Sequence, residues 1–394
     1  MKSDTIKFCS LCVISNQRPS SSVEFTNQGG PKRFIDFDEK NICEACRYNQ
    51  VKKQIDWGKR EEQLYKILDK YRLENGQYDC IVPSSGGKDS SLTAHKLKYK
   101  YGMNPLTVTW APNMFTEVGW NNFNNLARVG GIDNLLYTPS GPVHQLFTKL
   151  SFLNLCHPFQ PFIIGQKIIG PKIAQKFNIP LIIYGENQAE YGNNIDDNEI
   201  FEMDKRFYST SDPLKMRIGG ETVEVLIKEH DLKYNDLTAY LPLTPEEVNK
   251  SKLNFIYLGY FEKWDPQECF YYSVDNTGFQ PASERSEGTY SKYTEIDDMI
   301  VPFHFYTTLI KFGIGRATYD ASQEIRNDKI NREEGVQLVR KYDEEFPSRS
   351  FKTFLEYLNI SENDFIQTVN RFRPDYIWQS VGENEWKLRT AVWH

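Results

Sequence analysis

The chain has 394 residues, a mass of 46.0 kDa and a formal net charge of −6, with 47 basic and 53 acidic residues. This length favours two or three domains, and an aromatic content of 14% favours a well-filled core over intrinsic disorder. Residues 1–72 carry 14 Lys and Arg against 10 Asp and Glu, whereas the remainder is acidic. A protein that binds long nucleic acid over its whole surface is therefore disfavoured.

The N-terminal residues Met1–Thr5 lead into no apolar segment, so no secretory signal is expected. Apolar runs such as Leu181–Tyr184 are far shorter than the roughly 20 residues of a membrane span. Seven cysteines, an odd number, without an export signal argue against a disulfide framework. We therefore expect a cytoplasmic protein without a membrane partner.

Four of the cysteines form two pairs near the N-terminus, Cys9-x2-Cys12 and Cys43-x2-Cys46. Two such knuckles supply the four thiolates of a closed, tetrahedral structural zinc site. We expect a four-cysteine zinc-ribbon unit over 1–55, with residues 23–25 and 33–37 as the strands of its hairpin. A redox pair is the alternative, but a redox CxxC usually stands alone after a strand.

A linker helix is expected in the segment 56–77, because Leu64, Ile67, Leu68 and Tyr71 fall at positions 0, 3, 4 and 7 and Gly76 can stop the helix. We expect the helix to run from Trp57 to about Leu73.

Residues 78–240 alternate between strand and helix patterns. Strands are expected at 78–83, 106–110, within 131–137 and at 179–184, and helices are expected from Ser90 and over 166–177. This alternation predicts an α/β fold with a parallel, doubly wound sheet whose ligands bind beyond the carboxyl ends of the strands.

Residues 241–394 are expected to form a mostly helical C-terminal subdomain that binds the acceptor. Phe351, Phe354, Leu355 and Leu358 follow the helical period, and Ser361 with Asp364 resembles a capping box that starts a second helix.

The segment Ser84-Ser-Gly-Gly-Lys-Asp-Ser-Ser91 follows the first strand directly and opens a helix. It is not a Walker A loop, because Val82 stands where that motif needs its first glycine and Asp89 follows the lysine. Two glycines, a helix N-terminus and a lysine favour an anion, and an acidic residue suits Mg²⁺ held against phosphates. The alternative is a glycine turn capped by Ser or Asp.

This loop resembles the S-G-G-x-D-S loop of the PP-loop ATP pyrophosphatases, the adenine nucleotide alpha hydrolase-like enzymes. The cysteine pairs and a C-terminal tract narrow the resemblance to the N-acetyl sugar amidotransferases, which include the pseudaminic-acid biosynthesis protein and lipopolysaccharide O-antigen homologues. The tract consists of 287–291, 296–298, 311–318, 321–326 and 332–335.

The resemblance implies a reaction. ATP adenylates the carbonyl oxygen of a sugar acetamido group, giving an O-adenylyl imidate, and ammonia then displaces AMP to leave an acetamidino group. The sugar, which in this family can be nucleotide-linked, belongs to lipopolysaccharide O-antigen or flagellin glycans. Ammonia is expected from an external glutaminase that resembles the glutaminase and cyclase pair of histidine biosynthesis, and ATP, Mg²⁺ and structural Zn²⁺ are the implied cofactors.

The candidate site residues come from three sources: the glycine-rich loop, the residues at or just beyond the carboxyl ends of the strands (the strand-end rule), and the C-terminal tract. Those expected to bind ATP are Ser84, Ser85, Gly86, Gly87, Lys88, Asp89, Ser90, Thr109, Trp110 and Gly185. Lys88, Asp89 and Glu186 are expected to be catalytic, with Asp89 on Mg²⁺. Residues expected at the acceptor are Asn187, Glu287, Thr289, Asp297, Asp298 and Arg316. Core packing is the alternative for Trp110, and a surface position is the alternative for Glu186. Helix caps or surface ion pairs are the alternatives for the tract residues.

Two other functions fit parts of the pattern. A tRNA sulfurtransferase also uses a PP-loop, but only Cys156 suggests a reactive thiol, and Cys80, Cys156 and Cys269 are expected to be inert. A non-catalytic zinc-ribbon scaffold is the second alternative, and the intact loop argues against it.

Overall fold

The computed structural model describes residues 5–19, 34–191, 200–203 and 208–394. The expected strand at 23–25 and the first residue of the one at 33–37 lie outside the described residues. None of the helices in the described ranges is long and apolar enough to cross a membrane.

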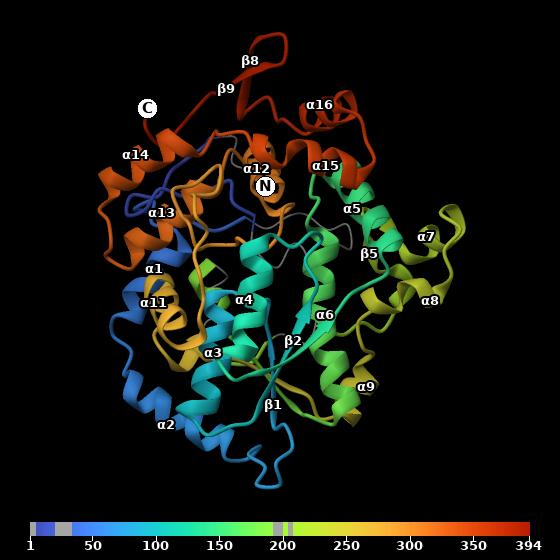
Figure 1. Ribbon diagram of the computed structural model, residues 1–394. Coiled ribbons are helices and arrows are strands. Elements are labelled where there is room, and N and C mark those ends of the chain that lie inside the picture. Colours follow the sequence, from blue (N-terminus) through green and yellow to red (C-terminus); the bar gives the residue numbers. More distant parts are fainter. Residues whose placement is uncertain (1–4, 20–33, 192–199, 204–207) are drawn as a thin grey trace.

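A five-stranded parallel sheet lies at the centre of the molecule and confirms the predicted α/β fold (Figure 1). In spatial order its strands are β3 (Asp133–Tyr137), β2 (Pro105–Trp110), β1 (Cys80–Pro83), β4 (Leu181–Tyr184) and β7 (Asn254–Tyr257). The chain builds outward from β1 to β3 on one side and then from β4 to β7 on the other. The order therefore reverses between β1 and β4, the kind of position at which open α/β sheets bind ligands.

The fifth strand lies beyond residue 240, where the sequence analysis placed the end of this domain. Residues of β7 pair with β4 from Leu181 opposite Asn254 to Tyr184 opposite Tyr257. β7 has only four residues and is separated from β4 by a long insertion. So short a segment does not show a hydrophobic period that would identify it as a strand.

Helices cover both faces of the sheet, as the sequence pattern predicts. Side chains of β1 alternate between the two faces: Cys80 and Val82 pack with the helices α2 (Trp57–Leu68), α3 (Lys88–Tyr99) and α4 (Glu117–Arg128). Ile81 faces the other side, where it belongs to the core formed with α5 (Gly141–Leu155) and α6 (Gln160–Phe177). Each sheet face therefore has its own hydrophobic core.

Two helix boundaries differ from expectation. The linker helix ends at Leu68 instead of near Leu73, and residues 69–71 continue it only as a turn. Helix α6 begins at Gln160, six residues before the expected start. By contrast, α15 (Phe351–Leu358) lies where the periodicity predicts it, and Ser361 and Asp364 form the capping box of α16 (Glu362–Arg371).

Among the described residues of the N-terminal unit, α1 (Glu44–Lys52) is the only helix. Its described residues also form isolated bridges between Phe8 and Ser15, Pro19 and Phe34, and Phe37 and Cys43. Its cysteines pack against Ile314 of the C-terminal part.

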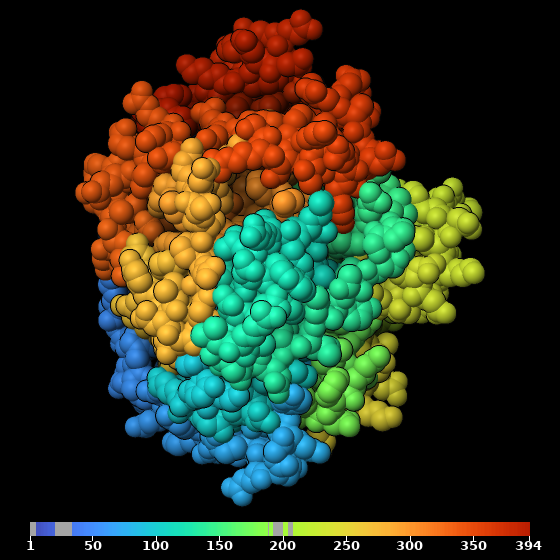
Figure 2. All heavy atoms as spheres, in the orientation of Figure 1, coloured from blue at the N-terminus to red at the C-terminus, as the bar shows by residue number. Residues whose placement is uncertain are grey.

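Helices of the C-terminal part lie over the end of the sheet, and in Figure 2 this part forms one continuous cap on the molecule. They are α12 (Val301–Phe312), α13 (Arg316–Arg326) and α14 (Arg332–Tyr342), followed by α15 and α16. By contrast, α11 (Pro266–Thr277) lies beside α3. A hairpin of β8 (Trp378–Gly382) and β9 (Glu385–Leu388) ends the chain. The remaining elements are η2 (Gln188–Tyr191), η5 (Pro213–Lys215), β5 (Arg217–Ile218), β6 (Glu221–Thr222), α7 (Val223–Glu229), α8 (Tyr234–Leu237), η6 (Thr238–Tyr240), α9 (Pro245–Lys250), α10 (Leu258–Phe261) and η7 (Ser348–Ser350).

Candidate active site

A cleft of about 540 Å³ opens at the carboxyl ends of β1 and β4, at the reversal of the strand order. The glycine-rich loop after β1 and the Gly185-Glu186 segment after β4 form one wall. Residues 293–297 and the helices α12 and α13 form the opposite wall, so the C-terminal part completes the site.

The backbone of the loop is shaped to approach a ligand. Gly86 has φ +82°, and a Cβ there would lie 2.7 Å from the backbone of Phe123, so only glycine fits. Gly87 is the N-cap of α3 and provides no side-chain cap. Because the N–H groups of the first helical turn lack intrahelical partners, they are available to an anion, and the helix dipole favours negative charge there.

Hydroxyl groups hold this loop from within. Ser84 Oγ donates to Ser90 Oγ at 2.9 Å and accepts from the Gly86 N–H at 3.1 Å, while Ser90 Oγ donates to the Gly87 oxygen at 3.1 Å. Ser84 and Ser90 therefore fix the loop, whereas Ser85 faces Asp297 across the cleft and hydrogen-bonds to it.

Lys88 and Asp89 open α3 and form an ion pair of 2.5 Å. Burial alone would lower the pKa of Lys88, but the neighbouring Asp89 carboxylate raises it above its usual range, so the ammonium stays charged. The second carboxylate oxygen of Asp89 accepts a hydrogen bond of 2.9 Å from Trp264 Nε1. Asp89 is thus held from two sides at the floor of the cleft.

Glu186 enters the cleft from the end of β4, so the surface alternative for this residue is wrong. Tyr191 donates a hydrogen bond of 2.8 Å to Glu186 Oε1. Burial, and then the nearby Asp89 carboxylate, raises the pKa of Glu186. The residue before it, Gly185, lies close to α3: a Cβ at this position would be 2.9 Å from Thr93 Oγ1.

The opposite wall adds three carboxyl groups, those of Glu295, Asp297 and Asp320. Burial raises the pKa of all three, that of Glu295 to about 7. Together with Asp89 and Glu186 they would repel a bare triphosphate, and oxygen ligands of this kind suit Mg²⁺. Asp297 was expected here; Glu295 and Asp320 were not, since no motif marks them.

The cleft is also lined by basic and aromatic side chains. Besides Lys88, its cationic or histidine side chains are Arg18, His157, Lys167, His304 and Lys311. Lys167 Nζ lies 4.6 Å from the centre of the Tyr184 ring, whose hydroxyl is buried without a hydrogen-bond partner among the described residues. Of these residues, only Tyr184 was within reach of the strand-end rule. Lys167, His304 and Lys311 come from helices, His157 comes from the segment between α5 and α6, and Arg18 comes from the cysteine unit.

Two of the expected ATP-binding residues lie in the core. Thr109 is completely buried within β2 and donates to Asn134 Oδ1 at 3.1 Å. Trp110 is 2% exposed, stacks on Tyr137 and packs against α6 at Gly165. Neither lines the cleft, so the core alternative for Trp110 is the correct one.

Most of the expected acceptor residues support the site from behind. The residues that do not line the cleft are Asn187, Glu287, Thr289, Asp298 and Arg316. Thr289 donates to Asp320 Oδ2 at 2.5 Å, and Asn187 accepts from the Ala189 N–H at 3.2 Å. Glu287 accepts from Ser348 and from the backbone N–H of Arg349.

Asp298 and Arg316 shape the opposite wall. Asp298 accepts hydrogen bonds from the N–H and side chain of Asn113 and from the Ile300 N–H, which ties residues after β2 to the start of α12. Arg316 is 2% exposed and donates to the backbone oxygens of Thr294 and Glu295. It therefore holds the segment that carries Glu295, which itself has φ +44°.

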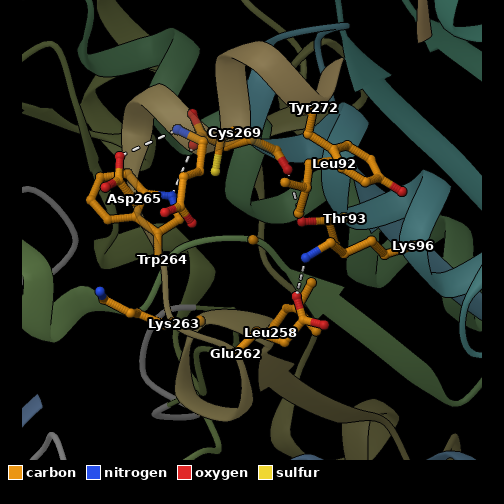
Figure 3. Close-up of a pocket in the computed structure, with 14 residues that line it drawn as sticks. Leu92, Thr93, Lys96, Leu258, Glu262, Lys263, Trp264, Asp265, Cys269 and Tyr272 are labelled. Atoms are coloured by element: carbon orange, nitrogen blue, oxygen red, sulfur yellow. Dashed lines mark hydrogen bonds and ion pairs between the residues drawn. The ribbon is translucent and has the colours of Figure 1, made fainter. Parts of the chain in front are cut away.

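A second, smaller pocket of about 140 Å³ lies behind the loop, between α3 and α11 (Figure 3). Asp89, Gly185 and Trp264 line both this pocket and the cleft. At its other side Lys96 pairs with Glu262 at 2.6 Å. The indole of Trp264 is thus part of the wall between the two cavities.

The four N-terminal cysteines come together, as their spacing predicts. Their sulfur atoms lie within 4.8 Å of one another, and Cys9–Cys46 and Cys12–Cys43 are each separated by 3.8 Å. Zn–S bonds of about 2.3 Å in a tetrahedron place sulfurs about 3.8 Å apart, so the donor set and its size fit structural zinc.

The other three cysteines are buried. Burial raises the pKa of the Cys156 thiol to about 11 and that of Cys80 and Cys269 well above the usual range. No cysteine lines the cleft, and all seven fall within the described ranges. A thiol nucleophile at the loop, as a sulfurtransferase would use, is therefore disfavoured.

Residues 287–392 match the family described as "LPS biosynthesis protein WbpG-like, C-terminal domain". The match begins at the first residue of the tract that carries the sequence resemblance. An uncharacterized protein of Methanocaldococcus jannaschii is 33% identical over 128 residues, which are 32% of this chain and 41% of that protein. The chain thus matches less than half the length of that relative.

Two solved structures are similar at a low level. A predicted subunit of tRNA methyltransferase from Methanocaldococcus jannaschii has a TM-score of 0.26 and 13% identity, covering 55% of this chain and 82% of that one. NMN synthetase from Francisella tularensis has a TM-score of 0.27 and 17% identity, covering 64% and 93%. Likeness at this level adds nothing to the fold described above.

Proposed function

We propose that this chain is an ATP-dependent amidotransferase of surface-glycan synthesis, because residues 287–392 match the WbpG-like C-terminal domain of lipopolysaccharide biosynthesis proteins. The observation that carries the proposal is the cleft itself. It joins an uncapped, glycine-rich helix start to a wall supplied by the WbpG-like domain. The substrate is an acetamido sugar, and the basic and aromatic side chains of the cleft suit a nucleotide-linked one.

The first step forms a bond between the acetamido oxygen and the α-phosphorus of ATP and releases pyrophosphate. The N–H groups of the first turn of α3 and the Lys88 ammonium bind the leaving pyrophosphate. Asp89 retains free lone pairs beside its bonds to Trp264 and Lys88, so it can still bind Mg²⁺. The amide nitrogen loses its proton as the O-adenylyl imidate forms.

In the second step ammonia attacks the imidate carbon, the C–O bond breaks and AMP leaves with the former acetamido oxygen. An amide is a poor electrophile, and adenylation of its oxygen supplies the leaving group. Glu186 lies beside the loop and is held by Tyr191, a position from which it can orient ammonia. We propose that the ammonia comes from a separate glutaminase and that the protein acts in the cytoplasm.

The test is an assay with Mg-ATP, ammonium and a panel of acetamido sugars, free and nucleotide-linked, that follows AMP, pyrophosphate and product mass. We expect AMP release to depend on one sugar, whose mass falls by about one unit as oxygen is replaced by NH and whose new amidine stays protonated at neutral pH, as a guanidinium does. Ser85→Ala and Asp89→Ala should lower the rate, by roughly 100-fold for Asp89. Ser283→Ala, outside the cleft, is the control. ATP cleavage triggered by tRNA and by no sugar would overturn the proposal.

A further inference from the structure

Helix α1 connects the four-cysteine cluster to the interior of the molecule. It begins directly after Cys43, carries Cys46 in its first turn and ends at Lys52, whose side chain is 2% exposed. Nine residues at about 1.5 Å each span roughly 13 Å. One end of the helix therefore carries two of the sulfur ligands, and the other end lies beneath the cleft.

Lys52 makes two close contacts at that end. Its Nζ lies 2.6 Å from the backbone oxygen of Trp264 and 2.6 Å from Glu190 Oε1. Glu190 is also buried, with 3% of its side chain exposed. Lysine and glutamate are rarely buried unless they are paired, so this pair holds two segments of the chain in one arrangement.

Each of these two contacts is connected, through a further hydrogen bond, to a carboxylate of the active site. Trp264, whose carbonyl oxygen accepts from Lys52, donates its indole N–H to Asp89. Glu190 belongs to η2 together with Tyr191, which donates to Glu186. One lysine thus fixes the supports of Asp89 on one side of the cleft floor and of Glu186 on the other.

A second connection runs in parallel from the same helix. Asn49 Nδ2 donates to the Arg326 oxygen at 2.7 Å, and Arg326 Nη2 donates to the Glu190 oxygen at 3.0 Å. Both the backbone and the side chain of Glu190 are therefore held from α1. The position of η2 depends on where this helix lies.

We propose that Lys52 is a positioning residue that makes the arrangement of Asp89 and Glu186 depend on metal occupancy of the four-cysteine cluster. With the metal bound, the start of α1 is fixed and Lys52 stays between Trp264 and Glu190. Without it, α1 loses its anchor at Cys43 and Cys46, and η2 and Trp264 loosen. The inference rests on the proposed function only in taking Asp89 and Glu186 as the groups that act on ATP.

The first variant is Lys52→Met, which keeps the length of the side chain and removes the charge. Lys53→Met is a matched control, because Lys53 is 56% exposed and pairs only with the exposed Asp328. Since Lys52→Met leaves Glu190 charged and buried, a second variant, Lys52→Met with Glu190→Gln, removes both charges and protects the test against simple misfolding.

Two measurements need no acceptor sugar: calorimetric Mg-ATP affinity, and hydrogen exchange of the amides in 185–191 before and after zinc chelation. In the wild type, chelation should speed exchange in 185–191 by about tenfold or more, as local unfolding would. In the double variant, exchange should already be faster than in the wild type, and chelation should speed it by a smaller factor, because only the link through Asn49 and Arg326 remains. Mg-ATP affinity should fall by about tenfold in both Lys52 variants and stay unchanged in Lys53→Met.

The inference is overturned if chelation speeds exchange in 43–52 but leaves 185–191 of the wild type unchanged. It is also overturned if Lys52→Met and Lys53→Met bind Mg-ATP equally well. A failed sugar assay would contradict the proposed function alone, because exchange and ATP affinity report on Lys52 without it.

Discussion

Trp110 ends strand β2 but points away from the cleft, because of the alternation of side chains along a strand. Leu106, Val108 and Trp110 share one face of the sheet, and all three belong to the same hydrophobic core. The indole lies against Gly165, where a Cβ would come within 2.2 Å of it. The alternation of side chains along this strand, which can be read from the sequence, therefore places Trp110 in the core.

Replacing this indole should affect stability and not nucleotide binding. We expect Trp110→Ala to lower the free energy of unfolding by about 3–5 kcal/mol, because it leaves a large cavity, and to leave Mg-ATP affinity unchanged. Urea denaturation and calorimetry measure the two quantities. Trp120→Ala is the control, since Trp120 is 45% exposed and its removal should cost less. A tenfold loss of affinity with unchanged stability would place the indole at the nucleotide instead.

Glu295 lies in the cleft without any sequence signal, and it predicts a pH dependence. Burial raises its pKa to about 7, so the group is neutral below this pH and charged above it. The added negative charge, next to Asp297 and Asp320, opposes bound phosphates. Without added Mg²⁺, ATP affinity should therefore weaken several-fold as the pH rises from 6 to 8.

The Glu295→Gln variant should remove this dependence and bind ATP at pH 8 as the wild type does at pH 6. Calorimetry at the two pH values is the measurement. Glu284→Gln is the matched control, because Glu284 has a 72% exposed side chain in the same segment and lies outside the cleft. An unaltered pH profile in Glu295→Gln would show that another group titrates.

At the scale of elements, the loop after β1 requires glycine at position 86 for two separate reasons, its backbone conformation and its lack of space. Gly86 combines φ +82° with a steric limit set by Phe123, whereas Gly76 has φ +78° and open space around it. Gly76→Ala should thus cost only the backbone strain, about 1 kcal/mol of unfolding free energy. Gly86→Ala should in addition displace the loop and lower Mg-ATP affinity by at least about tenfold. Equal ATP affinities in the two variants would contradict the role of Phe123 as a wall behind the loop.

The cysteine cluster makes a prediction at the same scale. Purified protein should contain one zinc per chain by elemental analysis, and Cys46→Ser should lose it and unfold at a lower temperature, since metal binding stabilises such units directly. Cys269→Ser, a buried cysteine outside the cluster, should keep its zinc. Full zinc content in Cys46→Ser would show that the cluster is not the metal site.

Local patterns predicted the elements that carry strong periodicity. The strands β1 to β4, the helix α15 and the capping box of α16 depend on neighbouring residues, and all of them lie where the sequence places them. The fifth strand, β7, is defined by its pairing with β4, in which each residue lies 73 positions from its partner, as Leu181 does from Asn254. Local patterns do not record such pairing.

At the scale of the whole molecule, the site residues also fall into two groups: those that local patterns predict and those that only the folded chain brings together. The loop, Glu186 and the cysteine cluster follow from motifs and from the strand-end rule. Glu295, Asp320 and Trp264 enter the cleft because the C-terminal part folds over the sheet, which no local pattern specifies. Polar residues of the C-terminal tract such as Thr289 and Arg316 proved to support that wall from behind, since a motif marks a residue without saying which way it faces.

Asp298 ties the two parts of the molecule together, and its pairing makes the last prediction. Its carboxylate accepts hydrogen bonds from Asn113, three residues after the end of β2, and from the Ile300 N–H at the start of α12. Asp298→Ala leaves these buried N–H groups without partners and should lower the free energy of unfolding by about 2–4 kcal/mol. Glu284→Ala, which breaks an exposed ion pair with Arg349, should change it by less than about 1 kcal/mol.

The sign of the pH dependence distinguishes this explanation from a general packing defect. Burial raises the pKa of Asp298 to about 7 from a usual value near 4, so the folded state binds its proton more tightly than the unfolded state does. The stabilisation from Asp298 is complete below about pH 4 and decreases as the pH rises to about 7. The difference between wild type and Asp298→Ala should thus be larger at pH 5 than at pH 8 in urea denaturation. A difference that is equal at both, or larger at pH 8, would mean that the carboxylate is bound in its charged form and that its hydrogen bonds outweigh its burial.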